Sequence, residues 1–140
     1  MIVTDEKILR QMSKEVSKVD TKVLKDMEDT MKKFDGIGIS AIQIGAPQRI
    51  FLAGNPAQVF INPKIKDKSS YTKVDWEGCL SCPGAHVRVR RSHSITIQYE
   101  DIEGKIIKRK FTGFDARVIQ HELDHLNGFL IKDRGKVYQE

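Results

Sequence analysis

Hydrophobic residues recur at helical spacing in the first quarter of the chain. Asp20 and Thr21 can each cap a helix that begins there. The apolar stripe that follows comprises Val23, Leu24, Met27, Met31 and Phe34. Steps of three and four residues predict an amphipathic helix, and Gly36 is well placed to end it.

A second segment with this spacing lies near the end of the chain. We expect a helix that starts near Thr112, whose hydroxyl with Asp115 resembles a capping box, and that stops at Asn127-Gly128. One face of this helix is expected to carry Phe114, Val118, His121 and His125.

Between these helices the pattern changes to alternation, which is typical of strands. Ser94–Glu100 and Lys105–Phe111, separated by a turn at Asp101–Gly104, predict a hairpin. The apolar face of its first strand comprises Ile95, Ile97 and Tyr99.

Two shorter strands are expected upstream, at Arg49–Ala53 and Gln58–Ile65, around a turn at Gly54-Asn55-Pro56. The glycine-rich stretch Gly36–Gly45 is predicted to be extended. Because strands come in runs and helices in only two places, the pattern favours an α+β fold with mostly antiparallel sheets over alternating βαβ units.

The composition is that of an ordinary globular protein, with 39% hydrophobic and 31% charged residues among 140. We expect one domain, 1–140, that buries a real core. No signal peptide is visible, and the longest uncharged run, Ile50–Pro63, is too short and too polar to span a bilayer. We therefore expect a soluble protein of the bacterial cytoplasm, or of the host cytoplasm if a phage encodes it, with both cysteines reduced.

Basic residues give the chain a net charge of +5 and gather in two clusters. These clusters are Arg88, Arg90, Arg91 and His93, and Lys105, Lys108, Arg109 and Lys110. One interpretation is the solvated face of a sheet, and the other is attraction to an anionic partner such as RNA or the ribosome surface. No aromatic residues interleave with these charges to stack bases, which argues against a dedicated nucleic-acid-binding role.

His121, Glu122 and His125 form the sequence HELDH, which matches the pattern His-Glu-x-x-His. On a helix the two histidines lie one turn apart, so both rings can reach one ion. Glu122 projects about 100° around the helix from His121, close enough to contact an attacking water without being a ligand. The pattern therefore predicts two nitrogen ligands and a carboxylate base for metal-activated hydrolysis.

The segment Glu77–Pro83 supplies a candidate third ligand, because the thiolate of Cys79 binds divalent metals strongly. Two nitrogens and one sulfur leave a fourth position open, as catalysis requires. The backbone N–H of Leu80 and the side-chain amide of Gln43 are candidate donors to a developing oxyanion.

Cys82 leaves a second interpretation open. Cys79-x-x-Cys82 with the two histidines can close around a structural zinc, which would leave no position for water. The gap between the two halves is far longer than in zinc fingers, and Glu122 would be an unpaired carboxylate beside such a site. We favour the open site; a metallopeptidase, a zinc module and an RNA-binding protein are the alternatives.

Three segments together resemble the peptide deformylase family. The family's glycine-rich GφGφAAxQ motif is matched by Gly36–Gln43, with serine at the first alanine. EGCLS is matched in full at Glu77–Ser81, and QHExDH at Gln120–His125. The order agrees, and the last helix looks more like the organellar and phage subgroup than the main bacterial type.

The resemblance implies removal of the formyl group from the N-terminal formyl-methionine of newly synthesised polypeptides, with release of formate. It implies an α+β fold in which antiparallel sheets surround the metal-bearing helix, with one N-terminal helix. The ion is expected to be iron(II), with zinc, nickel or cobalt as substitutes. The implied ligands are Cys79, His121 and His125, and the implied catalytic groups are Glu122, Gln43 and the Leu80 amide.

We expect six further residues to contact the substrate: Ile37, Gly38, Gly78, His86, Phe114 and Val118. Phe114 and Val118 precede His121 on one helix face, with Ile37 as an opposite wall, so they can line a narrow slot for methionine. His86 stands near the place of a substrate-binding arginine in many family members. We expect a monomer that acts on nascent formyl-methionyl chains, with transient ribosome contact through its basic surface and no membrane or DNA partner.

Overall fold

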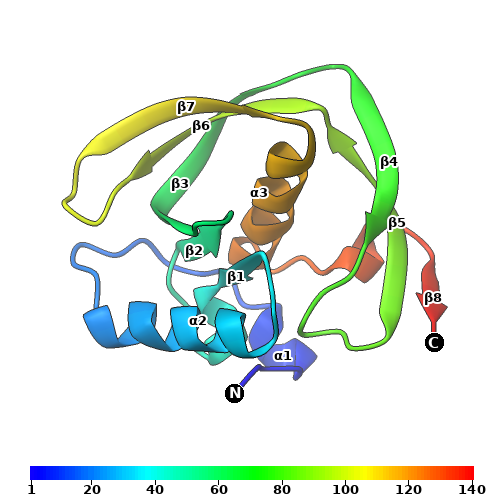
Figure 1. Ribbon diagram of the computed structural model, residues 1–140, viewed down its shortest axis with the longest axis horizontal. Coiled ribbons are helices and arrows are strands. Elements are labelled where there is room, and N and C mark those ends of the chain that lie inside the picture. Colours follow the sequence, from blue (N-terminus) through cyan, green and yellow to red (C-terminus); the bar gives the residue numbers. More distant parts are fainter.

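Helix α3 (Gly113–Leu126) lies at the centre of the fold, between two antiparallel sheets (Figure 1). The computed structural model describes all residues, Met1–Glu140. The expected α+β class is confirmed, since every pair of neighbouring strands in both sheets is antiparallel. No helix is long and apolar enough to cross a membrane.

The larger sheet has five strands in the order β1-β2-β3-β6-β7. Their bounds are Gly38–Ser40, Ile50–Ala53, Gln58–Lys68, Ser94–Glu100 and Ile106–Thr112. The predicted hairpin is confirmed as β6 and β7, and its alternating residues Ile95, Ile97 and Tyr99 are buried. They pack under α3 with Phe51, Phe60 and Leu126 in the largest hydrophobic cluster.

The smaller sheet has the order β4-β5-β8, with bounds Thr72–Glu77, Ala85–Ser92 and Val137–Gln139. It curves along the other side of α3, and β8 brings the end of the chain to its edge (Figure 1). On β5 the side chains of Val87 and Val89 are buried, whereas Arg88 and Arg90, which alternate with them, are exposed. Their alternation fixes which face of this sheet meets α3.

The N-terminal helix α2 (Thr21–Lys33) is confirmed, with Asp20 as its N-cap and Leu24, Met27 and Met31 buried. The predicted stripe was wrong at Phe34, which lies past the helix as its C-cap and is 41% exposed. The predicted end at Gly36 was also wrong, because Asp35 takes the left-handed conformation instead, with φ of 55°. A short helix α1 (Glu6–Leu9) precedes α2.

The glycine-rich stretch is only partly extended. After β1 the chain turns into the 3₁₀ helix η1 (Ala41–Ile44), which ends at Gly45 with φ of 90°. The expectation of an extended segment over its full length was therefore wrong, and the turn has a structural role. It buries the side chain of Gln43 instead of leaving it on a strand face.

Helix α3 begins and ends close to the predicted residues. Thr112 is its N-cap but makes no side-chain hydrogen bond, so the expected capping box with Asp115 is not formed. At the other end Asn127 is the C-cap and Gly128 has φ of 80°. Arg49 donates to the carbonyl of Leu126 at 3.0 Å, which places a cation at the negative end of the helix dipole. A 3₁₀ turn, η2 (Ile131–Asp133), follows.

Candidate active site

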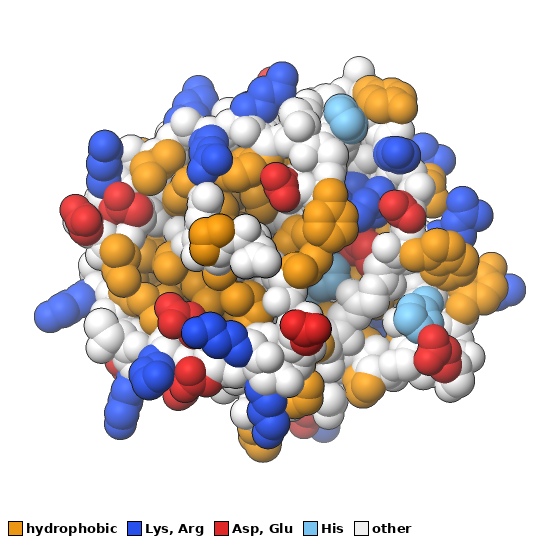
Figure 2. Space-filling view, viewed as in Figure 1, with side chains coloured by type: hydrophobic (Ala, Val, Ile, Leu, Met, Phe, Trp, Pro, Cys, Tyr) orange, Lys and Arg blue, Asp and Glu red, His pale blue; other side chains and the backbone are white.

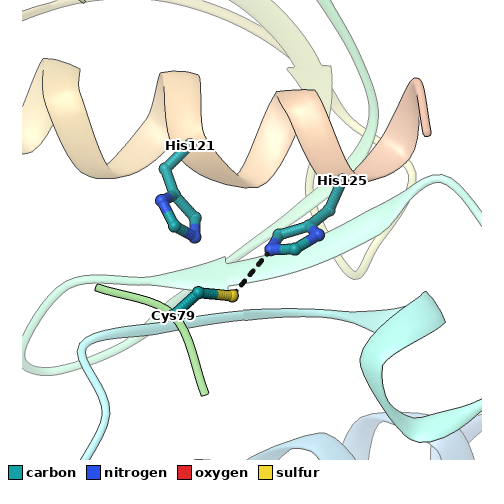
Figure 3. Close-up of side chains that lie close together, drawn as sticks. All are labelled: Cys79, His121 and His125. Carbon is teal, nitrogen blue, oxygen red and sulfur yellow. Dashed lines mark hydrogen bonds between the residues drawn. The ribbon is translucent and has the colours of Figure 1, made fainter. Parts of the chain in front are cut away.

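Three side chains that lie far apart in the sequence converge in front of α3. Cys79 comes from the loop after β4, and His121 and His125 come from successive turns of α3 (Figure 3). Their potential ligand atoms all lie within 4.8 Å of one another, and Cys79 Sγ is 3.3 Å from His125 Nε2. Two ligand atoms on one tetrahedral ion stand about 3.5 Å apart, so this donor set fits a divalent metal.

Cys82 is not part of this group. The atoms that converge belong to Cys79, His121 and His125 alone, and Cys82 lies one turn further along, with its backbone N–H donating to the carbonyl of Cys79 at 3.0 Å. The closed site of two cysteines and two histidines is therefore not formed. The three-ligand arrangement is the one that leaves a position for a reacting molecule.

His121 is held in place by a buried carboxylate. Its Nδ1 lies 3.0 Å from Glu77 Oε1, which leaves Nε2 free for an ion. Arg91 donates to both carboxylate oxygens of Glu77 at 2.9 Å, and Arg117 donates to Oε2 at 2.8 Å. Burial alone would raise the pKa of Glu77, but the hydrogen bonds from Arg91 and His121 outweigh it and hold that pKa well below its usual range. Such a carboxylate fixes the tautomer and orientation of a metal-binding histidine.

This cluster corrects one expectation and adds residues that the sequence did not reveal. Arg91 was grouped with the basic surface, but it is buried, and its second partner is Asp124 at 2.7 Å. Arg117 also donates to the carbonyls of Val89 and Lys73. The position of Glu77 two residues before Cys79 was the only available signal, because the partners of a carboxylate depend on the tertiary fold.

Glu122 lies beside the ligands and is 4% exposed. Its Oε1 has no hydrogen-bond partner. Burial raises the pKa of Glu122 to about 7, against the opposing effect of His121. A Cβ atom on Gly38 would stand 2.7 Å from Glu122 Oε2, so the absence of a side chain at Gly38 keeps that carboxylate accessible. A carboxylate with such a pKa can accept and return a proton near neutral pH.

The side-chain amide of Gln43 is anchored at its oxygen, and its nitrogen donates on the side where Cys79 lies. Its Oε1 accepts from the backbone N–H of Ser40 at 3.0 Å, so its Nε2 points towards Ser81 Oγ at 3.0 Å and Cys79 Sγ at 3.6 Å. The backbone N–H of Leu80 has no backbone acceptor. Two donors therefore stand on the side of the site where Cys79 lies.

The remaining predicted residues line one cavity of about 500 Å³. The set comprises Ile37, Gly38, Gly78, His86, Phe114 and Val118, together with Glu122, Gln43, Leu80, Cys79 and His121. His125 is buried and does not line the cavity. Figure 2 shows a histidine at the bottom of a hollow near the middle of this face, with hydrophobic side chains beside it. Trp76 and Arg117 also line the cavity, and no motif identified them in advance.

The pKa values of the two histidines are shifted in opposite directions. Burial lowers the pKa of His125 well below its usual value, so this imidazole is neutral and suited to bind a metal. Burial would also lower the pKa of His121, but its hydrogen bond to Glu77 and the charge of Glu122 raise it overall. The hydrogen bond with Cys82 and burial raise the pKa of Cys79. Binding of an ion would therefore release protons.

Comparison with known proteins agrees with this geometry. The family model described as polypeptide deformylase matches residues 1–139. The chain belongs to the polypeptide deformylase family. It is 42% identical to the peptide deformylase of Thermotoga maritima over 132 residues. This alignment covers 91% of this chain and 80% of that protein. Members of this family are enzymes, so the reaction of this chain is deformylation of a polypeptide.

Two solved deformylase structures extend the likeness to three dimensions. The Plasmodium falciparum peptide deformylase in complex with an inhibitor has a TM-score of 0.92 at 38% identity, covering 97% of this chain and 89% of that one. The Met-Ala-Ser-bound class I type b peptide deformylase of Acinetobacter baumannii has a TM-score of 0.91 at 30% identity, covering 96% of both chains. The deformylase fold is therefore present over nearly the whole chain.

Proposed function

We propose that Cys79, His121 and His125 bind one divalent ion, iron(II) in the cell, with zinc, nickel or cobalt as substitutes. The convergence of one sulfur and two nitrogens within 4.8 Å supports this ligand set. A bound ion would lower the pKa of water from 15.7 towards roughly 7 and polarise the formyl carbonyl. The carboxylate of Glu77 orients His121 for this task.

Glu122 acts as the base and then as the acid of the reaction. It accepts a proton from the attacking water and delivers it to the amine that leaves with the peptide. The unpartnered Oε1 and the pKa of about 7 support this role, because the carboxylate is half protonated near neutral pH and is not held by another side chain. Formate and a free methionine N-terminus are the products.

Gln43 and the backbone N–H of Leu80 stabilise the negative charge that develops on the formyl oxygen. The anchoring of Gln43 Oε1 by Ser40 supports this role, since the amide nitrogen then faces the site before the substrate arrives. A donor that is already oriented costs no rearrangement during the reaction.

The methionine side chain occupies a slot between Ile37 and the residues Phe114 and Val118 of α3, and the peptide backbone passes Gly38 and Gly78. His86 contacts the substrate further along the cavity. Their common position around one cavity with His121 supports this arrangement. An unbranched thioether fits a narrow apolar slot, and norleucine should replace it well because such slots discriminate weakly between similar apolar groups.

The substrate in the cell is the nascent formyl-methionyl polypeptide, and the chain works in the cytoplasm as a monomer whose residues 1–140 form one catalytic domain. The exposed Arg88 and Arg90 of β5 and the cations of β7 offer a basic surface for transient contact with the ribosome. We expect no membrane or DNA partner for this protein.

The convergence of Cys79, His121 and His125 beside an unpartnered Glu122 is the observation that carries the proposal. The test is formate release from formyl-Met-Ala-Ser by anaerobically prepared protein loaded with iron(II). Unformylated Met-Ala-Ser is the matched control. Formate from the first peptide and no cleavage of the second are expected. Hydrolysis inside the unformylated peptide would instead identify a metallopeptidase.

A further inference from the structure

Cys79 and Cys82 lie at the two ends of one tight turn. The backbone N–H of Cys82 donates to the carbonyl of Cys79 at 3.0 Å, and Leu80 and Ser81 are the central residues of the turn. The Cα atoms of the first and last residues of such a turn are less than about 7 Å apart. A disulfide needs Cα atoms about 4.4–6.8 Å apart, so the backbone between the two cysteines already suits one.

The two thiols interact, although only one of them belongs to the ligand cluster. Both cysteines are free and neither is fully buried, and their side chains share a hydrogen bond. At the same time Cys79 Sγ lies 3.3 Å from His125 Nε2, on the side of the histidines (Figure 3). One sulfur therefore has two partners in reach. Because the thiolate is the form that binds metal ions, a disulfide at Cys79 and an ion at Cys79 exclude each other.

Cys82 lies between two cavities. It lines the active-site cavity and also a second cavity of about 380 Å³. The second cavity lies among the N-terminal segment, η2 and β8, and its lining includes Thr4, Leu9, Leu130 and Val137. A small molecule can therefore reach Cys82 from a side that the substrate does not occupy.

We propose that Cys82 is an oxidation site for small hydroperoxides such as hydrogen peroxide, and that its oxidation withdraws Cys79 from the metal as a disulfide. This inference rests on the proposed function, because it takes Cys79 to be a metal ligand. The Cys82 thiol gives two electrons to the peroxide, the O–O bond breaks, and a sulfenic acid and one water result. The sulfur of Cys79 then attacks the sulfenic sulfur, and the displaced hydroxide takes up a proton and leaves as a second water.

The disulfide leaves His121 and His125 as the only ligands, so the ion should dissociate. Reduction of the disulfide restores the thiolate and with it the complete site. A metal-binding thiolate without a neighbouring thiol is instead oxidised further to sulfinic acid, which is irreversible. Cys82 therefore makes the loss of the ion reversible.

The test uses zinc-loaded protein, because zinc has no redox chemistry and only the thiols are then oxidised. About one equivalent of hydrogen peroxide is added, since one peroxide oxidises two thiols. Zinc release to a coloured chelator and the free-thiol content are followed, with untreated protein as the baseline. Zinc should leave in step with the loss of both thiols, and dithiothreitol with added zinc should restore the bound ion. Retained zinc, or a release that dithiothreitol does not reverse, would overturn the proposal.

Mass spectrometry identifies the bond that forms. Both cysteines lie in one tryptic peptide, Val74–Arg88, because cleavage follows Lys73 and Arg88. This peptide should become lighter by two hydrogen atoms after treatment and regain them on reduction. A peptide that is heavier by two oxygen atoms, with sulfinic acid at Cys79 and a thiol at Cys82, would contradict the proposal.

Cys82→Ser and Cys82→Ala remove the second thiol and leave the three ligands in place. Both variants should bind zinc before treatment, which shows that they are folded. Peroxide should release their zinc at least roughly tenfold more slowly and irreversibly, because Cys79 has no partner for a disulfide. Met12→Leu, which removes an exposed sulfur elsewhere, is the matched control and should behave as the wild type. Zinc release from both Cys82 variants at the wild-type rate would refute the role of Cys82.

The peptide Met-Ala-Ser, a product of the proposed reaction, tests the route of access. At saturating concentration it should leave peroxide-driven zinc release nearly unchanged, and complete protection would rule out access through the second cavity. None of these measurements needs turnover. Absence of formate from every formylated peptide would therefore refute the proposed function alone, whereas formate release by a protein that keeps its zinc under peroxide would refute the oxidation site alone.

Discussion

Two buried glutamates of the same site have opposite properties. Glu77 is fully paired with arginines and His121, and its pKa is lowered, whereas Glu122 has an unpartnered oxygen, and burial raises its pKa to about 7. The difference lies mainly in their neighbours, because both residues are buried but only Glu77 has cationic partners on its oxygens. Glu77 is therefore suited to orient a ligand, and Glu122 to exchange protons.

Replacement of Glu122 by alanine should keep the ion and abolish turnover. Loss of one positioned proton-transfer group usually lowers the rate by about 10² to 10⁴-fold. Formate release and metal content are measured on the same preparation. A variant that keeps both its metal and a near-normal rate would remove Glu122 from the mechanism.

Cys79→Ser should lose or greatly weaken metal binding, whereas Cys82→Ser should leave the stoichiometry and the rate nearly unchanged. The reason is that only Cys79 has its sulfur among the converging ligand atoms. Metal analysis after gel filtration distinguishes the two variants. Equal loss of metal from both would support the closed site of two cysteines and two histidines.

Gln43→Leu should lower kcat more than it raises KM, because the amide donates to charge present mainly in the transition state. A drop of roughly 10² to 10³-fold matches the loss of one oxyanion donor. Steady-state kinetics on formyl-Met-Ala-Ser provide the check. An effect on KM alone would make Gln43 a residue that binds the ground state.

At the residue scale, the sequence predicted the three side chains that converge, because candidate metal ligands are recognised from residue type and helical spacing. His121 and His125 lie one turn apart in any helix, and Cys79 was the favoured thiolate, with Cys82 as the alternative. Trp76 could not be predicted, because its place at the cavity depends on how the smaller sheet curves around α3. Arg91 was misinterpreted for the same reason, because the local sequence does not reveal that the inward face of β5 meets the carboxylates of Glu77 and Asp124.

At the element scale, α3 and the smaller sheet are joined mainly by charged and polar side chains. Glu77, Arg91 and Arg117 form one buried cluster between β4, β5 and α3. Gln120 adds a pair of hydrogen bonds to the backbone of Ser92, at 2.9 and 3.1 Å. Buried ions are expensive to separate, so the removal of one member has a large effect.

Glu77→Gln should therefore lower the free energy of unfolding of the metal-free protein by about 3–5 kcal/mol, because the buried guanidinium of Arg117 loses its carboxylate partner and that of Arg91 keeps only Asp124. The effect should depend on pH. The pKa of Glu77 in the folded state lies below the ordinary value of 4.5. Its ionised form therefore contributes fully to the free energy of unfolding above about pH 4.5, and this contribution is lost as the pH falls below that point.

Urea unfolding at a series of pH values provides the measurement. The wild type should lose more stability than the variant between about pH 5 and pH 2, so the two curves should converge in acid. Glu28→Gln, an exposed position on α2, is the control and should change little. Parallel curves for Glu77→Gln and the wild type would contradict the argument.

The longest periodic elements were predicted, whereas the three strands of the smaller sheet were not. The helices α2 and α3 and the hairpin of β6 and β7 have long, clear patterns of apolar residues. The strand β4 was missed because apolar and polar residues do not alternate regularly along it. The strand β8 has only three residues, and none of them is buried. Such strands exist through their partners on β5, which a local pattern does not contain.

At the scale of the whole molecule, we expect α3 and the smaller sheet to open as one cooperative unit. Arg117 donates to the carbonyls of Val89 and Lys73, so it ties the helix to two strands at once. Arg117→Met should reduce the hydrogen-exchange protection of β4 and β5 amides by roughly 10- to 100-fold, as expected for the loss of buried hydrogen bonds worth about 1–3 kcal/mol. Protection in β2 and β3 should change much less. A uniform loss over all strands would contradict the idea that α3 and the smaller sheet open as a separate unit.

The separation of the ligands along the chain sets the order of events during synthesis. Cys79 and His125 are 46 residues apart, and their contact forms only when the loop after β4 meets a completed α3. The two histidines can be presented by a short helix alone, but the thiolate cannot. A growing chain therefore has no complete binding site until its last helix has left the ribosome and folded. We therefore expect an ion to bind late, after the tertiary structure has formed, so that it stabilises the folded chain and does not direct folding.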